Sequence, residues 1–249
     1  MTLEVDQVVV KRGSTEIGPI TFSVQKGEVL SICGKNGSGK TSSLYGITGM
    51  IRRQSGKVVI DGVPSENFRP REMARKMTLV QQEMPVPMSF TVKDVMEISA
   101  YSRGNDRNEL MHALETCRIS KLSGRDFATL SGGEKRMVSI AAAIYQDTDY
   151  IMLDEPTSFL DIDRIHLLSG IIDRMKSAGK SIVCVIHDIN FASSVSDSML
   201  LMKDGKMIAC GRKGDIMTVE NMERTYDAEF RSYSSPEGLR FYPVFRDDL

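Results

Sequence analysis

The sequence predicts an α/β protein with a mainly parallel sheet and helices on both faces of that sheet. Short apolar runs alternate with helical patterns from residue 29 to residue 82 and again from residue 150 to residue 203. A glycine-rich loop, Gly34 to Thr41, joins the first of these apolar runs to a helical pattern. Residues from about 91 to 146 hold no convincing strand and predict a helical insert between the two alternating halves.

The first half of the chain reads as strands separated by turns and short helices. Leu44, Ile47 and Ile51 give the helical spacing that follows the glycine-rich loop, and Asp61-Gly62 is a turn signal. Pro85 and Pro87 interrupt the chain, and Thr91 is placed to cap a helix that runs to about Tyr101. The expected elements are strands over residues 3–10, 20–24, 29–33, 56–62 and 77–80, and a helix over residues 70–76.

The second half returns to strand–helix alternation and then forms a hairpin. Gly179 stops a long helix, and Asp204-Gly205 is a hairpin turn. Residues 234–249 carry no readable signal. The expected elements are strands over residues 150–153, 181–186, 199–203 and 206–210, and helices over residues 161–178 and 188–196.

Size and composition exclude several classes of protein. The 249 residues allow one large α/β domain, and 41% apolar with 26% charged residues is ordinary for a soluble globular chain. The net charge of −1 gives no electrostatic case for nucleic-acid binding. No apolar run approaches the roughly 18–20 residues that span a bilayer, and no signal peptide precedes the first strand, so any membrane role is expected to act through a partner. The four cysteines are far apart, which favours buried thiols in a reducing cytoplasm over disulfides or zinc.

The glycine-rich loop has the G-x-x-x-x-G-K-[ST] pattern of a phosphate-binding P-loop. It stands between a predicted buried strand and a predicted helix, where backbone N–H groups and a helix N-terminus favour phosphate. We expect Lys40 to reach the β- and γ-phosphates of a nucleoside triphosphate and the Thr41 hydroxyl to bind Mg²⁺. A plain glycine turn is the weaker interpretation, because a chance match to the pattern arises in only about one chain in a hundred.

Polar side chains follow three of the predicted strands. Asp154 and Glu155 end an apolar run, so Asp154 is expected to hold Mg²⁺ and Glu155 to polarise the attacking water. Gln82 follows another strand and offers an amide for Mg²⁺ or water, and His187 ends a third where it can contact a γ-phosphate. Each of these residues alone would be interpreted as a loop or packing residue. The functional interpretation is favoured because the P-loop is present in the same chain.

A second anion-binding pattern lies in the helical insert. Leu130-Ser131-Gly132-Gly133-Glu134 precedes a helical pattern and supplies a hydroxyl and two glycine amides at a helix N-terminus. A simple helix cap would explain Ser131 but not both glycines. Two phosphate sites this far apart are explained if two copies pair head-to-tail, so that each nucleotide lies between the P-loop of one copy and this loop of the other.

Taken together, these motifs resemble an ABC-type ATP-binding cassette over nearly the whole chain. The resemblance rests on the P-loop, Gln82, the Leu130–Glu134 signature, Asp154-Glu155-Pro156-Thr157-Ser158, Leu160-Asp161 and His187-Asp188. It implies a single nucleotide-binding domain over residues 1–249. That domain would have a RecA-like P-loop NTPase core, an antiparallel β subdomain and an inserted helical subdomain at about 91–146.

The same resemblance implies the site residues. The implied cofactors are ATP and Mg²⁺. The implied catalytic residues are Lys40, Gln82, Glu155 and His187, and the implied metal ligands are Thr41, Gln82 and Asp154. The implied nucleotide contacts are Arg12, Gly34, Lys35, Asn36, Gly37, Ser38, Gly39, Lys40, Thr41, Ser42, Ser131, Gly132, Gly133, Glu134 and Asp161. One departure concerns the base. No aromatic residue stands near the end of the first strand, so adenine would meet either the guanidinium of Arg12 or the apolar Val10, and GTP could compete.

Residues beyond His187 are similar to cassettes of iron-siderophore, haem and vitamin B12 importers. The matching stretches are residues 187–192, 203–206 and 218–226. This similarity implies an energy-coupling ATPase that works as a paired head-to-tail dimer at the cytoplasmic face of the cell membrane. Its partners would be integral-membrane permease subunits, contacted through the Gln82 region, and indirectly a solute-binding protein.

Three other functions are compatible with parts of the pattern. A soluble ABC ATPase of iron–sulphur cluster assembly has the same size and motifs, although Pro156-Thr157-Ser158 fits transport cassettes better. A nucleic-acid or ribosome protein would need two cassettes or a long coiled coil. A regulatory module without hydrolysis would have lost Glu155 or His187, and both are present.

Overall fold

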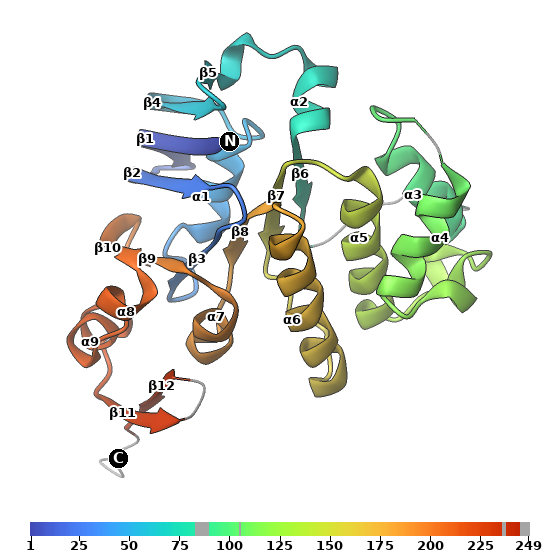
Figure 1. Cartoon of the computed structure of the whole chain (residues 1–249). Helices are drawn as coiled ribbons and strands as arrows, with labels where there is room; N and C mark the ends of the chain where they lie inside the picture. Colours follow the sequence, from blue (N-terminus) through green and yellow to red (C-terminus); the bar gives the residue numbers. More distant parts are fainter. Residues whose placement is uncertain (83–89, 105, 236–237, 245–249) are drawn as a thin grey trace.

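The computed structural model describes residues 1–82, 90–104, 106–235 and 238–244, and in this part of the chain the central sheet has six strands (Figure 1). Their order is β10-β9-β3-β8-β7-β6. The strands are β3 (Val29–Gly34), β6 (Met77–Val80), β7 (Tyr150–Asp154), β8 (Ser181–Val185), β9 (Ser198–Lys203) and β10 (Lys206–Arg212). All pairs are parallel except β9–β10. Every residue of β3, β7 and β8 is buried, as expected for parallel strands covered on both faces.

A second, antiparallel sheet covers one side of the core. It contains β1 (Thr2–Arg12), β2 (Thr15–Gln25), β4 (Arg53–Ile60) and β5 (Val63–Pro64), in the order β2-β1-β4-β5. Helix α1 (Lys40–Ile47) packs between this sheet and the central one, and its Leu44 and Ile47 are buried. A Cβ on Gly46 would lie 2.3 Å from Cγ1 of Val10, so glycine lets α1 approach β1 closely. This contact brings the end of β1 next to the P-loop.

The opposite face of the central sheet packs on three helices. They are α5 (Gly132–Gln146), α6 (Ile162–Ser177) and α7 (Ile189–Val195), which share one apolar core with β3, β7 and β8. Helices α3 (Val92–Ser99) and α4 (Arg107–Thr116) pack on α5 and lie outermost in Figure 1. In the described part of residues 91–146 there is no β-strand, as predicted. The division of the chain at about 91 and 146 stays a proposal.

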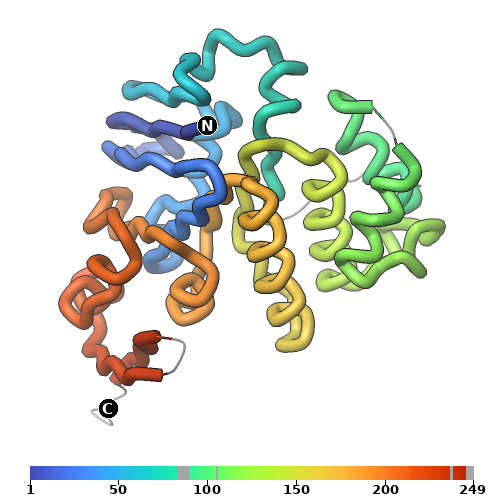
Figure 2. Tube along the Cα trace, viewed as in Figure 1, coloured from blue at the N-terminus to red at the C-terminus, as the bar shows by residue number. Residues whose placement is uncertain are grey.

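The remaining elements connect or extend these layers. They are α2 (Pro70–Lys76), α8 (Lys213–Ile216), α9 (Val219–Tyr226), the hairpin strands β11 (Phe230–Ser235) and β12 (Gly238–Pro243), and 3₁₀ turns at Ser65–Asn67, Ser120–Leu122 and Phe127–Thr129. In the tube of Figure 2 the hairpin β11–β12 lies below α7, far from α3 and α4.

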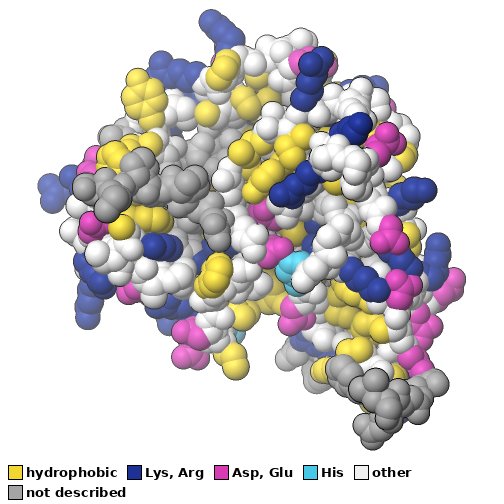
Figure 3. All heavy atoms as spheres, turned by 180° about the vertical axis from the view of Figure 1, so that it is seen from behind, with side chains coloured by type: hydrophobic (Ala, Val, Ile, Leu, Met, Phe, Trp, Pro, Cys, Tyr) yellow, Lys and Arg dark blue, Asp and Glu magenta, His cyan; other side chains and the backbone are white. Residues whose placement is uncertain are grey.

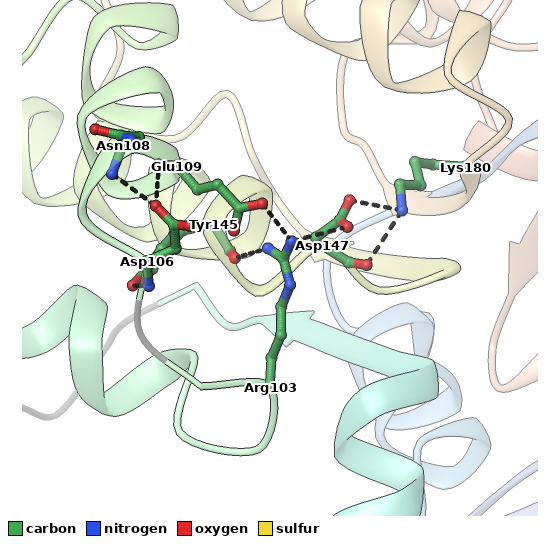
Figure 4. A network of polar contacts seen from close by, with 7 residues as sticks. All are labelled: Arg103, Asp106, Asn108, Glu109, Tyr145, Asp147 and Lys180. Carbon is green, nitrogen blue, oxygen red and sulfur yellow. Dashed lines mark hydrogen bonds and ion pairs between the residues drawn. The ribbon is translucent and has the colours of Figure 1, made fainter.

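A polar network ties the helical layer to the core at the end of α5 (Figure 4). Arg103 donates to the carbonyl of Tyr145 over 2.9 Å and to Glu109 over 2.8 Å. Lys180, just before β8, pairs with Asp147 over 2.8 Å. Both cations stand at the carboxyl end of α5, where the helix dipole favours positive charge.

Charges of both signs are mixed over the surface seen in Figure 3, with apolar side chains between them. No helix in the described residues has both the length and the apolar character required to cross a membrane. The four cysteines are free, as predicted, and Cys210 is only half-buried.

Most predicted elements are confirmed to within two or three residues, and one prediction is wrong. Helix α1 ends at Ile47, so Ile51 lies beyond it, because Gly49 takes a left-handed φ of 79°. The C-terminal stretch that carried no signal contains part of the hairpin β11–β12. Pro85 and Pro87 lie outside the described residues.

Candidate functional site

The P-loop connects β3 to α1 at the carboxyl edge of the central sheet. Gly34, Gly37 and Gly39 all have positive φ, at 153°, 80° and 97°. A Cβ at Gly34 would lie 2.1 Å from the carbonyl oxygen of Met202, and one at Gly39 would lie 2.8 Å from Ile17. Gly34 and Gly39 are therefore required both by backbone conformation and by space, whereas Gly37 is required by conformation alone.

Lys40 is buried at the start of α1. Its Nζ donates to the carbonyls of Gly34 and Lys35, each 2.8 Å away. Burial lowers the pKa of Lys40, and the nearby Glu155 opposes that shift. The ammonium is thus held over the loop by the loop's own backbone, close to where phosphates would lie.

Thr41 and Asp154, two of the predicted metal ligands, are hydrogen bonded to each other. The Thr41 hydroxyl donates to Oδ1 of Asp154 over 2.9 Å. Asp154 is fully buried, and its Oδ2 makes no hydrogen bond with the described residues, although the Tyr45 hydroxyl lies near enough to affect the carboxyl. Burial raises the pKa of Asp154, opposed by the bond from Thr41. A buried carboxylate oxygen without a donor, next to a hydroxyl, fits Mg²⁺, a hard cation that takes few protein ligands.

Glu155 stands between Gln82 and His187. Gln82 donates to Oε2 of Glu155 over 2.9 Å, and Nε2 of His187 contacts Oε1. The Ser158 hydroxyl also donates to Oε2, over 3.2 Å. The three predicted residues follow β6, β7 and β8, which are adjacent in the sheet, so their side chains converge at one edge.

These residues open onto one cleft of about 400 Å³, the P-loop cleft. Arg12 at the end of β1 lines it, donating weakly to Ser42 over 3.4 Å, and Ile17 lies across from the loop. The lining residues are Arg12, Thr15, Ile17, Asn36, Gly37, Gly39, Lys40, Thr41, Ser42, Gln82, Glu155 and His187. The volume and the cation-rich, glycine-rich floor suit a nucleoside triphosphate.

The predicted signature, Ser131 to Glu134, lies outside this cleft in the single chain. Ser131 caps α5, and its hydroxyl and backbone N–H both bond to Glu134 over 2.8 Å. A Cβ at Gly133 would lie 2.8 Å from the carbonyl oxygen of Phe159, so only glycine fits there. Asp161, at the start of α6, is also outside the cleft, where it accepts from the backbone of Arg164 over 3.0 Å.

Arg136 is a site residue that the sequence did not reveal. It lies one turn into α5 and is 3% exposed. It donates to the carbonyl of Gln81 over 2.6 Å and to the carbonyls of Asp154 and Glu155. Burial lowers its pKa to about 10. One buried side chain therefore connects the signature helix to the backbone of the residues around the cleft.

The sequence matches the protein family described as ABC transporter over residues 17–158, which is more than half of the chain. The match begins in β2 and ends just past Glu155. It includes the P-loop, Gln82, the signature and the Asp154–Glu155 pair.

Two curated relatives match almost end to end. The chain is 32% identical to the petrobactin import ATP-binding protein YclP of Bacillus subtilis over 222 residues, covering 86% of this chain and 88% of the relative. It is 30% identical to the hemin import ATP-binding protein HmuV of Myxococcus xanthus over 240 residues, covering 91% and 90%.

Solved structures agree in fold. An inward-facing ABC transporter provisionally assigned to the metal-chelate type superimposes with a TM-score of 0.83 at 22% identity, covering 100% of this chain and 99% of that one. A dimeric bacterial ABC transporter cassette superimposes with a TM-score of 0.77 at 23% identity, covering 85% of this chain and 98% of that one. At this identity the likeness establishes the fold, a P-loop core with an antiparallel subdomain, and confirms the predicted class.

Proposed function

Because the chain belongs to the ABC transporter family and is an ATPase of that family, we propose that it couples ATP hydrolysis to the import of a metal chelate such as hemin or an iron siderophore. The observation that carries the proposal is the placing of Glu155 between Gln82 and His187, above the P-loop cleft. Relatives named for hemin and petrobactin import support the chelate class. A cobalamin-like solute stays within the proposal.

In the proposed reaction, Glu155 orients or deprotonates a water for in-line attack on the γ-phosphate. Lys40 and the P-loop amides stabilise the charge that develops on the phosphate oxygens. His187 and Gln82 hold the carboxylate of Glu155 and contact the γ-phosphate side of the cleft. Thr41, Asp154 and Gln82 would hold Mg²⁺, which when bound would neutralise charge shared between the β- and γ-phosphates.

The proposed site is completed by a second copy of the chain. Ser131 and the amides of Gly132 and Gly133 lie outside the P-loop cleft and so cannot reach a nucleotide bound there in the same chain. In a head-to-tail dimer they would close over the γ-phosphate of the partner copy, with Asp161 near the same interface. Dimeric cassettes of the same fold support this arrangement.

The proposed partners are integral-membrane permease subunits, which place the chain peripherally at the cytoplasmic face of the cell membrane. A solute-binding protein would act through those subunits. The import proteins among its relatives support such partners. The region that follows Gln82 is the proposed contact, and residues 83–89 of it lie outside the described part of the chain.

The proposal is tested by uptake in the source cells. A chromosomal Glu155→Gln substitution is expected to abolish ATP-dependent accumulation of radiolabelled ferric siderophore or hemin. Glu66→Gln, which changes an exposed carboxylate that does not line the cleft, should leave uptake intact. The tagged protein should purify from membranes with polytopic subunits. Undiminished uptake of every chelate tested, together with purification with soluble scaffold proteins, would contradict the proposal and favour the iron–sulphur assembly alternative.

A further inference from the structure

The C-terminal segment, residues 219–235 and 238–244, contacts Lys35 in the P-loop and Asn190 near His187. It comprises α9, β11 and β12, and in Figures 1 and 2 these elements run below β9 and β10 to the side of α7. A two-stranded hairpin has little stability of its own, so β11 and β12 depend on what they pack against. Phe230 and Phe241 supply that packing, because both are buried in the core shared with α7.

Asp227 connects this segment to the P-loop. It ends α9 with a left-handed φ of 50°, and its Oδ2 accepts from Nζ of Lys35 over 2.8 Å. Its other oxygen pairs with Lys203 on β9. The carbonyl of Lys35 is one of the two that hold Nζ of Lys40. Asp227 therefore acts on the residue whose backbone orients the catalytic lysine.

Tyr226, the residue before it, is partly buried, and its hydroxyl oxygen is enclosed. Its hydroxyl lies beside the backbone of Gly34 without a hydrogen bond of good geometry, and within electrostatic reach of Asp188. Gly34 provides the other carbonyl that holds Lys40, and Asp188 follows His187 directly. The ring packs against Phe230 at 5.8 Å between centroids, so α9 and β11 form one packed unit here.

Asn190 connects the segment to the His187 side. It lies in the first turn of α7, three residues after the histidine. Its Nδ2 donates to the carbonyl of Phe241 over 3.0 Å, and its Oδ1 accepts from the N–H of Phe241 over 2.9 Å. Arg240 donates to the carbonyl of Asn190 over 2.9 Å. The side-chain amide thus pairs with β12 as a neighbouring strand would.

We propose that Asp227 and Asn190 are positioning residues, through which the C-terminal segment holds the Lys40 loop and the His187 loop at a fixed separation across the γ-phosphate. The inference rests on the proposed function of the cleft. Asp227 and Lys35 are half-exposed, so their ion pair adds little to the stability of the fold. Loss of the Asp227–Lys35 pair is therefore expected to shift the geometry of the site more than the free energy of unfolding.

The two contacts predict different kinetic effects in the full-length protein. Asp227→Ala loosens the P-loop and is expected to raise KM for ATP, and Kd for a fluorescent ATP analogue, by about threefold to tenfold with kcat within about twofold. Asn190→Ala frees the His187 loop and is expected to lower kcat by about threefold to tenfold with KM unchanged. Asp227→Glu should restore most of the ATP affinity.

Matched controls separate positioning from stability. Asp6 pairs with Lys57 over 3.4 Å, and its exposed fraction of 50% matches the 53% of Asp227. Gln146 makes a comparable pair of bonds with its amide, to Ala74 and Thr78, away from the cleft. Asp6→Ala and Gln146→Ala should leave KM and kcat unchanged, whatever they do to the thermal midpoint.

The inference is overturned if Asp227→Ala and Asn190→Ala match their controls in KM and kcat, or if both lower activity only in proportion to lost folded protein. A parent protein that neither binds nor hydrolyses ATP would contradict the proposed function instead. The two failures are therefore told apart by the parent's own activity in the same assay.

Discussion

The side-chain amide of Gln82 donates a hydrogen bond to Glu155 over 2.9 Å, and His187 contacts the other oxygen of the same carboxylate. The three residues follow three neighbouring parallel strands and are far apart in sequence. Glu155 itself has a left-handed φ of 50°, and its backbone N–H donates to the carbonyl of Val185 over 3.0 Å. The carboxylate is therefore fixed above the P-loop cleft by contacts from both sides.

Glu155→Gln keeps the size of the side chain and one acceptor oxygen but removes the base. We expect the variant to bind ATP with parent-like affinity, to dimerise in ATP, and to hydrolyse it at least about 100-fold more slowly. Single-turnover hydrolysis and size-exclusion chromatography with ATP measure the two effects. Glu66→Gln is the control, and parent-like turnover by Glu155→Gln would rule out the proposed base.

Arg136→Met removes the buried guanidinium but keeps a long side chain. The backbone carbonyls of Gln81, Asp154 and Glu155 would each lose the Arg136 donor, although that of Glu155 keeps the N–H of Ser158. We expect the free energy of unfolding to fall by about 2 kcal/mol. We also expect kcat to fall by a larger fraction than the amount of folded protein does. Urea denaturation and ATPase assays measure both, with the exposed Arg174→Met as control. Equal stability and activity in parent and variant would contradict the role given to Arg136.

Arg12→Ala tests how the base is held. The guanidinium lines the cleft where an aromatic residue is absent, and it would stack on the face of a purine rather than read its edge. We expect the affinities for ATP and GTP to fall together, by about threefold to tenfold. Lys11→Ala, the exposed neighbouring cation, should change neither. Unchanged binding of both nucleotides in Arg12→Ala would exclude stacking by Arg12.

Asp61 gives the fold an acid-sensitive contact. Burial opposes its ionisation, but hydrogen bonds from Lys76 and Tyr150 outweigh burial and lower its pKa below the ordinary 3.8. The contribution of the Asp61 charge to the free energy of unfolding is therefore complete above pH 3.8, and it is lost as the pH falls through the lowered pKa. Asp61→Asn should cost about 1–2 kcal/mol in the free energy of unfolding at pH 7.

Chemical denaturation at several pH values measures this difference. The difference in free energy of unfolding between the parent and Asp61→Asn should become smaller as the pH drops below 3.8, because the parent then loses the same charge. Asp6→Asn, in an exposed pair, should show no such narrowing. A gap that is constant from pH 7 to pH 3 would show that the Asp61 charge does not stabilise the fold.

Much of the cleft follows from local pattern. The P-loop spacing defines a strand, a turn and a helix start, and residues that follow parallel strands meet at one edge of the sheet. Gln82, Asp154, Glu155 and His187 could therefore be grouped from the sequence, and the structure brings them together with Lys40. Their chemical roles stay predictions.

Other parts depend on contacts that no local pattern carries. In the sequence, Arg136 looks like any exposed cation on an amphipathic helix. Its burial depends on hydrogen bonds to the carbonyls of Gln81, Asp154 and Glu155, which are far from it in the chain. The hairpin β11–β12 has mostly exposed residues and no apolar alternation, since only Phe230 and Phe241 turn inward. Its position depends on Asn190, about 50 residues earlier in the chain.

In the proposed dimer, each ATP lies between the P-loop of one copy and Ser131 of the other. Lys40→Ala and Ser131→Arg should each abolish ATPase activity alone. In a mixed dimer, one site would combine both defects and the other would be intact. Mixing the two inactive variants in equal amounts with ATP should therefore restore activity, up to about one quarter of the parent. A mixture as inactive as its parts, although mixed dimers are detected, would contradict the shared site.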